Sequence, residues 1–153
     1  MTKILMVASH GGHYVQLCKA ESFLKSRVNK ENVEVIKVST NSSLLESGMV
    51  NYVVDDFNAN SLRVALKVFW ASLRILIHEK PSTVISTGAL PGLMFCITAR
   101  LLNIKTVWID SVANYQELSK SGKAARYIVS VCCTQWPHLS MKYRRLKFVG
   151  RVL

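Results

Sequence analysis

Short hydrophobic stretches alternate along this chain with longer stretches of helical pattern. The short ones are rich in Val and Ile and are bounded by turn residues, which is typical of strands. They predict seven strands, within residues 4–8, 33–39, 51–56, 83–88, 105–110, 126–133 and 147–150. The longer ones predict helices over 14–26, about 61–79 and 92–103, and Pro81 stops the second of these.

The order of these elements predicts the fold class. Alternating strands and helices are typical of an α/β fold, a Rossmann-like parallel sheet with helices on both faces. At 153 residues, half of them hydrophobic, the chain suits a single domain over residues 1–153. The uncharged stretch 81–99 holds Pro91 and Gly92 in its middle, so we expect a buried strand, a loop and a buried helix there. No transmembrane helix is therefore expected.

The turns that follow the predicted strands carry the candidate chemistry. In parallel sheets, ligands bind beyond the carboxyl ends of the strands. The glycines of "SHGGH" and "TGALPG" let the backbone approach a ligand closely, and the helices that follow favour an anion. With "DSVAN" after the fifth strand, these turns predict a phosphate-containing ligand in a common crevice. The candidate binding residues are Ser9, His10, Gly11, Gly12, Thr87, Gly88, Ser111 and Asn114.

Several other ligand classes lack their usual residues. Neither glycine turn matches G-x-G-x-x-G or a P-loop, which argues against NAD and ATP. The four cysteines show no C-x-x-C spacing and lie in apolar surroundings, so we interpret them as buried thiols. No residues have metal-ligand spacing. We expect neither a cofactor nor a metal.

The net charge of +11 predicts an anionic partner. From Leu118 to Leu153 there are eight Lys or Arg residues and no Asp or Glu, which is unusual for a surface that is merely solvated. A solvated basic surface that keeps the protein soluble is the alternative. Within this stretch, Lys123 and Arg126, together with Lys120, are predicted to form a flexible basic flap near the phosphate. No nucleic-acid-reading motif is present, and we expect no nucleic-acid partner.

The long helix at 61–79 carries its basic residues on one narrow stripe and is apolar almost everywhere else. Two interpretations remain open. The helix is buried with only this stripe in water, or part of its apolar arc contacts a membrane interface beside the basic stripe. The candidate membrane-contact residues are Arg63, Lys67, Phe69, Trp70 and Arg74.

Four segments together carry a family resemblance: "SHGGH", "STGALPG", "WIDS" and "QWPHLSMKYRRLKFVG". They resemble the Alg14-like oligosaccharide biosynthesis proteins, the acceptor-side, membrane-recruiting subunits of two-component UDP-sugar glycosyltransferases. Bacterial relatives of that family act in capsule and exopolysaccharide synthesis. The layout is also similar to the N-terminal half of the single-chain enzyme that adds GlcNAc to the peptidoglycan lipid precursor. One departure is Asp110, where the family often has Glu.

The resemblance implies one half of an active site. The chain would correspond to the N-terminal domain of a GT-B glycosyltransferase and bind a lipid-pyrophosphate-linked sugar acceptor. A separate subunit would bind the UDP-sugar, so that this chain is half of an inverting hexosyltransferase and inactive alone. It would be peripheral on the cytoplasmic face of the membrane, against an anionic surface.

His13 and Asp110 are the candidate catalytic residues under this reading. An imidazole titrates near neutral pH and suits a base for the acceptor hydroxyl, although a histidine at a helix start can also simply bind phosphate or backbone. Asp110 is a second candidate base, or else a carboxylate that orients His13, a sugar hydroxyl or a loop amide. Two other functions stay open: a stand-alone nucleotide-binding Rossmann-fold enzyme and a basic nucleic-acid-binding protein.

Overall fold

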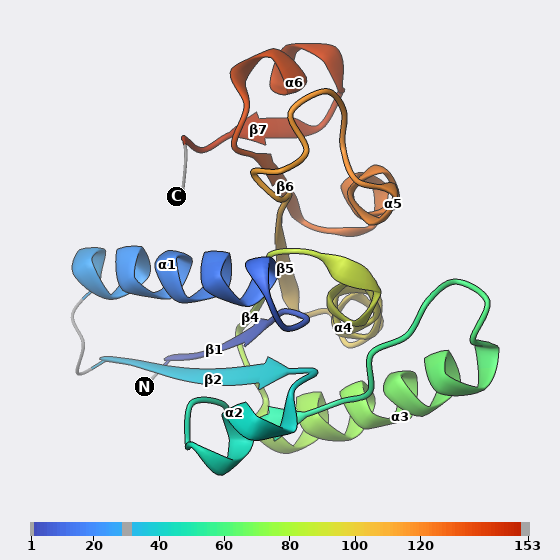
Figure 1. The fold of residues 1–153 in the computed structure, drawn as a ribbon. Helices are drawn as coiled ribbons and strands as arrows, with labels where there is room; N and C mark the ends of the chain where they lie inside the picture. Colours follow the sequence, from blue (N-terminus) through green and yellow to red (C-terminus); the bar gives the residue numbers. More distant parts are fainter. Residues whose placement is uncertain (1, 29–31, 151–153) are drawn as a thin grey trace.

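The computed structural model describes residues 2–28 and 32–150, which form a seven-stranded parallel sheet (Figure 1). The strand order is β3-β2-β1-β4-β5-β6-β7, and every neighbouring pair is parallel. The order reverses between β1 and β4, because the chain builds outward from β1 in one direction and then from β4 in the other. The strands are β1 (Thr2–Val7), β2 (Val33–Ser39), β3 (Tyr52–Val53), β4 (Thr83–Ser86), β5 (Lys105–Ile109), β6 (Val131–Thr134) and β7 (Leu146–Phe148).

Helices lie on both sides of this sheet, which confirms the predicted α/β class. In Figure 1, α1 lies on one side of β1 and β2, and α3 and α4 lie on the other. The helices are α1 (Gly12–Arg27), α2 (Ser42–Glu46), α3 (Leu62–Glu79), α4 (Ala89–Leu101), α5 (Lys120–Ile128) and α6 (Pro137–Lys142). As expected, the uncharged stretch 81–99 forms β4 and most of the buried helix α4. No helix in the described ranges is long and apolar enough to cross a membrane.

The predicted strand over 126–133 is wrong in its first half. Residues 120–128 form α5, and β6 starts only at Val131. The Ser119 side chain caps α5 by accepting a hydrogen bond from the Gly122 N–H at 2.8 Å, which supplies a helix start that the apolar pattern hides. Because the last turn of α5 is itself apolar, it merges in the sequence with the strand that follows.

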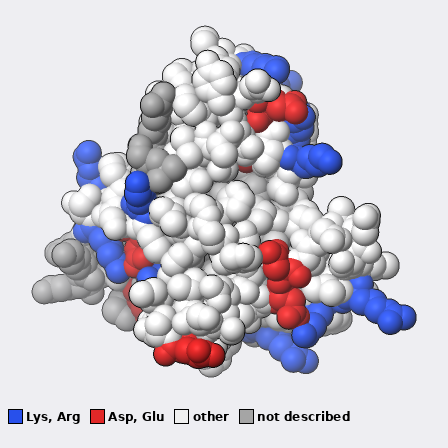
Figure 2. Space-filling view, viewed as in Figure 1, with Lys and Arg blue, Asp and Glu red and all other residues white. Residues whose placement is uncertain are grey.

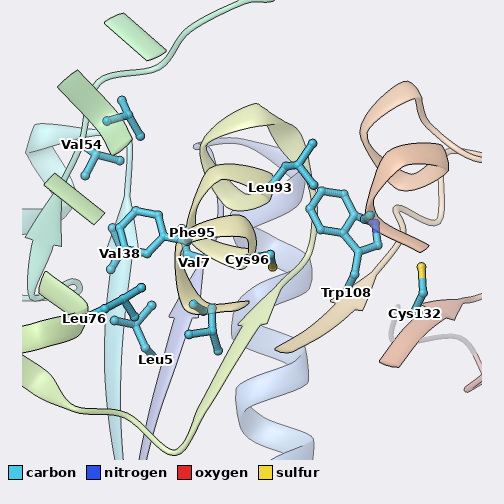
Figure 3. Packing of buried hydrophobic residues seen from close by; sticks show 14 of the residues in the cluster. Leu5, Val7, Val38, Val54, Leu76, Leu93, Phe95, Cys96, Trp108 and Cys132 are labelled. Carbon is cyan, nitrogen blue, oxygen red and sulfur yellow. The ribbon is translucent and has the colours of Figure 1, made fainter. Parts of the chain in front are cut away.

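The main hydrophobic core lies on the side of the sheet covered by α3, α4, α5 and α6. Figure 3 shows Phe95 of α4 reaching toward the strands and Trp108 of β5 lying beside Leu93. Phe95 and Trp108 are fully buried. Burying side chains of this size is the largest favourable contribution to folding, at roughly 25 cal/mol per Å² of apolar surface.

The opposite face has a smaller core, and α1 is the one described helix that contributes to it. Along β4 and β5 the side chains that point to the main core are fully buried, whereas Ile85, Val107 and Ile109 on the α1 face are only half-buried. Beside α1 these three residues line an apolar groove of about 310 Å³ whose rim includes Phe23, 64% exposed, and Val149. In the described residues, this part of the sheet therefore lacks the helix cover that its other face has.

Candidate functional site

The turns that follow β1 and β4 meet where the strand order reverses. In parallel sheets this is the place where a crevice opens between neighbouring turns. The β1 turn leads into α1 through Gly11 and Gly12, and the β4 turn leads into α4 through Thr87 and Gly88. The residue that joins the two turns is His13.

His13 is held by two hydrogen bonds to Thr87. Its Nδ1 lies 3.0 Å from the Thr87 carbonyl oxygen, and the Thr87 hydroxyl donates to the His13 carbonyl oxygen at 2.7 Å. A carbonyl oxygen only accepts, so the first bond places a proton on Nδ1 and leaves Nε2 as the acceptor nitrogen of the neutral ring. Thr87 is fully buried with its hydroxyl used in this way, so its side chain serves His13 rather than a phosphate.

Gly88 makes room for the imidazole. A Cβ atom at this position would lie 2.5 Å from both Nδ1 and Cε1 of His13, closer than real Cβ contacts. Its φ of 137° is also one that L side chains rarely adopt. The absence of a side chain at Gly88 therefore allows the His13 ring to pack against this turn.

The first turn of α1 is open to a ligand. Gly11, the N-cap, has φ 79°, no side chain of the described residues caps this helix, and its first turn contains no acidic residue. Gly11 and Gly12 are exposed, and a side chain at either would meet nothing within 4 Å. The free N–H groups of a helix start attract an anion. A cavity of about 430 Å³ adjoins this turn, and Gly12, His13, Val15, Gln16, Ser111, Val112 and Ala113 line it.

Asp110 does not face this crevice, contrary to our expectation. It is 1% exposed, and its carboxylate accepts four hydrogen bonds from its own loop and from β5. Oδ1 accepts from the Trp108 indole at 3.2 Å and the Ser119 hydroxyl at 2.6 Å, while Oδ2 accepts from the Asn114 amide and the Ser119 N–H, both at 3.1 Å. Asn114, another predicted ligand contact, is thus engaged with Asp110. The carboxylate shapes the loop between β5 and α5.

Sequence reasoning missed Gln16 and Gln135, which connect that loop to α1. Both are buried, and the Gln135 amide donates to Gln16 Oε1 at 2.7 Å. Gln16 also donates to the Ser111 hydroxyl at 3.0 Å and accepts from the Val112 N–H at 3.1 Å. Ser111, a predicted contact, is among the residues that line the cavity. Polar residues inside the apolar runs "HYVQLC" and "CCTQWP" were the available signal.

The remaining predicted contacts lie elsewhere. His10 is exposed, and its N–H and Nδ1 both contact the Thr40 hydroxyl, at 3.0 and 3.2 Å. Ser9 is buried. The flap prediction is wrong, because Lys123 lies on the regular helix α5 and pairs with Glu117 at 2.7 Å, which raises the pKa of the lysine. Arg126 lines a different cavity, at the amino end of β6 and β7.

A family model of the oligosaccharide biosynthesis protein Alg14 like family matches residues 4–152. The chain belongs to the Alg14-like family. The subunit ALG14 of UDP-N-acetylglucosamine transferase from Mus musculus is 30% identical over 90 residues, which cover 55% of this chain and 42% of the relative. The same-named subunit from Schizosaccharomyces pombe is also 30% identical, over 56% of this chain and 40% of the relative. The chain thus spans less than half of these curated relatives.

Solved structures show the same fold. MurG of Acinetobacter baumannii superposes with a TM-score of 0.78 over 97% of this chain and 46% of that one, at 16% identity. A UDP-N-acetylglucosamine 2-epimerase from Rickettsia bellii has a TM-score of 0.72, over 99% and 45%, also at 16% identity. This Alg14-like chain therefore resembles in its fold a part, less than half, of these longer proteins. In the described ranges no group of three His, Cys, Asp or Glu residues is placed to hold a metal ion.

The α3 helix of this Alg14-like chain has an exposed apolar face bordered by cations. Trp70 is 57% exposed and contacts Phe69 edge to face, with ring centroids 5.7 Å apart. Leu62, Leu66 and Ile77 are also exposed, and at 100° per residue they share one side with Trp70. Figure 2 shows basic side chains over the outer end of this helix. The exposed residues next to this apolar face are Arg63, Lys67 and Arg74.

Replacing Asp110 by Asn is expected to destabilise the fold by about 2–4 kcal/mol. The NH2 group of the new side chain is a hydrogen-bond donor, and it would lie against buried groups that are donors themselves. The free energy of unfolding in urea measures this. Asp56→Asn is the matched control, since Asp56 is exposed and its carboxylate accepts from the N–H of the next residue; it should change stability by less than about 0.5 kcal/mol. Equal effects of the two variants would contradict the role given to Asp110.

Proposed function

We propose that this chain is the acceptor-binding subunit of a membrane-associated, two-component glycosyltransferase that uses a UDP-sugar. The observation that carries the proposal is a helix start that no described side chain caps, beside a histidine whose Nδ1 lies against a backbone carbonyl oxygen and whose Nε2 is therefore the acceptor nitrogen. Family membership supports it, because the relatives are named as subunits of UDP-N-acetylglucosamine transferase. The acceptor is a sugar linked to lipid through pyrophosphate.

The pyrophosphate of the acceptor binds at the first turn of α1. Gly11 and Gly12 present backbone N–H groups without side-chain obstruction, and the helix dipole adds favourable electrostatics for a negative group. The neighbouring cavity lies between this turn and Ser111 to Ala113, and it takes the sugar attached to the pyrophosphate. The phosphates and the reacting hydroxyl would then both lie near His13.

His13 acts as the general base on this half of the enzyme. Nε2 takes the proton of the acceptor hydroxyl while the hydroxyl oxygen forms a bond to the anomeric carbon of the donor. The bond from that carbon to the UDP oxygen breaks, and UDP leaves with the electron pair. Thr87 and Gly88 hold the ring in place, whereas Asp110 is a positioning residue that acts through the loop carrying Ser111. Burial raises the pKa of the nearby Tyr14 to about 12, so its phenol stays protonated.

A separate subunit supplies the UDP-sugar site and docks on the α1 face of the sheet. The groove there is apolar and lacks the helix cover that the other face of β4 and β5 has in the described residues. Parallel sheets normally bury both faces. The occupant that fits is an amphipathic helix of the partner, laid beside α1 with its apolar side on Ile85, Val107 and Ile109.

The outer face of α3 contacts an anionic membrane surface. An exposed apolar strip next to a basic stripe is the arrangement of interfacial helices, whose apolar side enters the headgroup region while cations meet anionic lipids. Trp70 lies at the border between the two, which suits the amphipathic indole ring.

Replacing His13 by Gln is expected to lower kcat at least about 100-fold in the reconstituted reaction, because the base is lost. The assay combines this chain, its UDP-sugar subunit, membranes and a lipid-pyrophosphate acceptor. His10→Gln is the matched control, since His10 belongs to the same turn but contacts Thr40; it should keep activity within about threefold. Comparable losses in both variants would reject His13 as the base. Equal rates with and without this chain would reject the proposed function itself.

Replacing Phe23 by Asp is expected to weaken binding of the UDP-sugar subunit at least about tenfold, because it puts a charge on the rim of the apolar groove. Co-purification and titration of the two chains measure the effect. Leu101→Asp is the control, since Leu101 is similarly exposed, 67% against 64%, but lies on α4. If both variants bind the partner normally, the groove is not the docking site.

Replacing Trp70 by Asp is expected to weaken binding to vesicles that contain phosphatidylglycerol at least about tenfold, because apolar contact is lost and a negative charge is added. Sedimentation with vesicles measures the bound fraction. Leu101→Asp again serves as the control, with little effect expected. Unchanged vesicle binding by the Trp70 variant would exclude α3 as the membrane contact.

A further inference from the structure

A second cavity, of about 510 Å³, opens at the edge of the sheet opposite the glycine turns. Its lining comes from the end of α5 and from the amino ends of two strands. In a parallel sheet the amino ends of the strands lie at the edge away from the turns that follow their carboxyl ends, so this cavity is separate from the proposed acceptor site. The lining residues are Arg126, Val129, Ser130, Val131, Cys132, Arg145, Leu146 and Lys147.

Three of these lining residues are cations that pair with no acidic side chain among the described residues. No carboxylate of the described residues lies within 4.0 Å of the charged nitrogens of Arg126, Arg145 or Lys147. The sequence has no Asp or Glu after Glu117. Like charges gathered around one concave site repel each other, and a bound anion removes that repulsion.

Arg126 is held in position before any ligand binds. Its guanidinium lies over the rings of Tyr127 and Tyr143, with 4.3 and 5.2 Å from Cζ to the ring centroids. It also donates to the Tyr127 hydroxyl. Its Nε is buried and has no hydrogen-bond partner in the part of the chain that is described. A buried N–H without a partner is costly, so a further acceptor at this position would be favourable.

Arg145 adopts a backbone conformation that favours glycine. Its φ of 67° lies in the left-handed region, which is unfavourable for L residues other than Asn or Asp. The turn from α6 into β7 thus carries a cation where glycine would fit the backbone better. Such conformations are found more often at functional sites than elsewhere in proteins.

We propose that this cavity, lined by Arg126, Arg145 and Lys147, binds a phosphate group, carried by either a lipid headgroup or a soluble phosphate compound. The planar guanidinium matches phosphate oxygens with paired donors, and the lysine adds a mobile charge. The cavity volume lies within the usual range of small-ligand sites, about 300–1,000 Å³. The site is distinct from the first turn of α1 and does not depend on the proposed transferase role.

The test titrates the full chain with sodium phosphate and with sodium pyrophosphate, following heat of binding and the NMR signal of the Arg126 Nε–H. Arg145→Gln is expected to weaken pyrophosphate binding at this site at least about fivefold. Arg144→Gln is the matched control, because it removes the same charge from the adjacent exposed residue, which does not line the cavity; it should change affinity less than about twofold. Arg145→Gly removes the cation while relieving the left-handed backbone, so it should lose binding without losing stability.

Two further measurements separate the sources of the phosphate. Weaker binding to phosphatidylglycerol vesicles in Arg145→Gln than in Arg144→Gln would assign a lipid headgroup, and phosphate binding without that difference would assign a soluble compound. Pyrophosphate bound only at the first turn of α1 would be unaffected by all three variants. In that case, or if the Arg144 and Arg145 variants weaken binding equally, the proposal is overturned while the proposed function stands. Tighter competition by an acidic peptide than by pyrophosphate would also overturn it.

Discussion

The parallel direction of all seven strands is the constraint on which the candidate site depends. It brings the turns after β1, β4 and β5 to one edge of the sheet, although His13 and Thr87 are 74 residues apart in the chain. The strand order reverses between β1 and β4, so their two following helices diverge and a crevice opens between the turns. The two hydrogen bonds between His13 and Thr87 then fix how the turns meet. The Gln16 and Gln135 amides attach the third turn to the same helix.

Much of the fold could be predicted because its strands are continuous apolar runs between turn residues. That pattern also predicted that the three turns converge, since the rule for parallel sheets needs only the strand order. It failed at α5, where the apolar end of the helix continues into β6 and where the signal for the helix start is the hydrogen bond from Gly122 to Ser119. The pattern also could not show that Asp110 turns inward, because its donors come together only when its loop closes.

The two faces of the sheet differ in a way that composition does not reveal. Four helices bury one face, while α1 contributes alone to the core on the other in the described residues. The difference is visible along a single strand: Thr106 and Trp108 of β5 are fully buried, and Val107 between them is half-buried. Neighbouring residues of one strand therefore differ in their role. Those that point to the main core stabilise the domain, and those on the α1 face remain accessible to the proposed partner. Only the fold distinguishes the two sets. The same holds for α3, where one side packs on α4 and the other carries Trp70 into solvent.

Dividing the proposed reaction between two chains has a consequence for specificity. A base on one subunit and a UDP-sugar on the other come into reach only when the subunits are joined, so neither half can pass the sugar to water efficiently on its own. The proposed acceptor lipid would stay in the bilayer, and a surface that contacts the membrane would shorten the search for it. In this chain the glycine turns and the exposed face of α3 both belong to the elements of a single sheet and its packed helices. Binding to the membrane would then orient the helix start that takes the pyrophosphate, and activity would be restricted to complexes assembled at the bilayer.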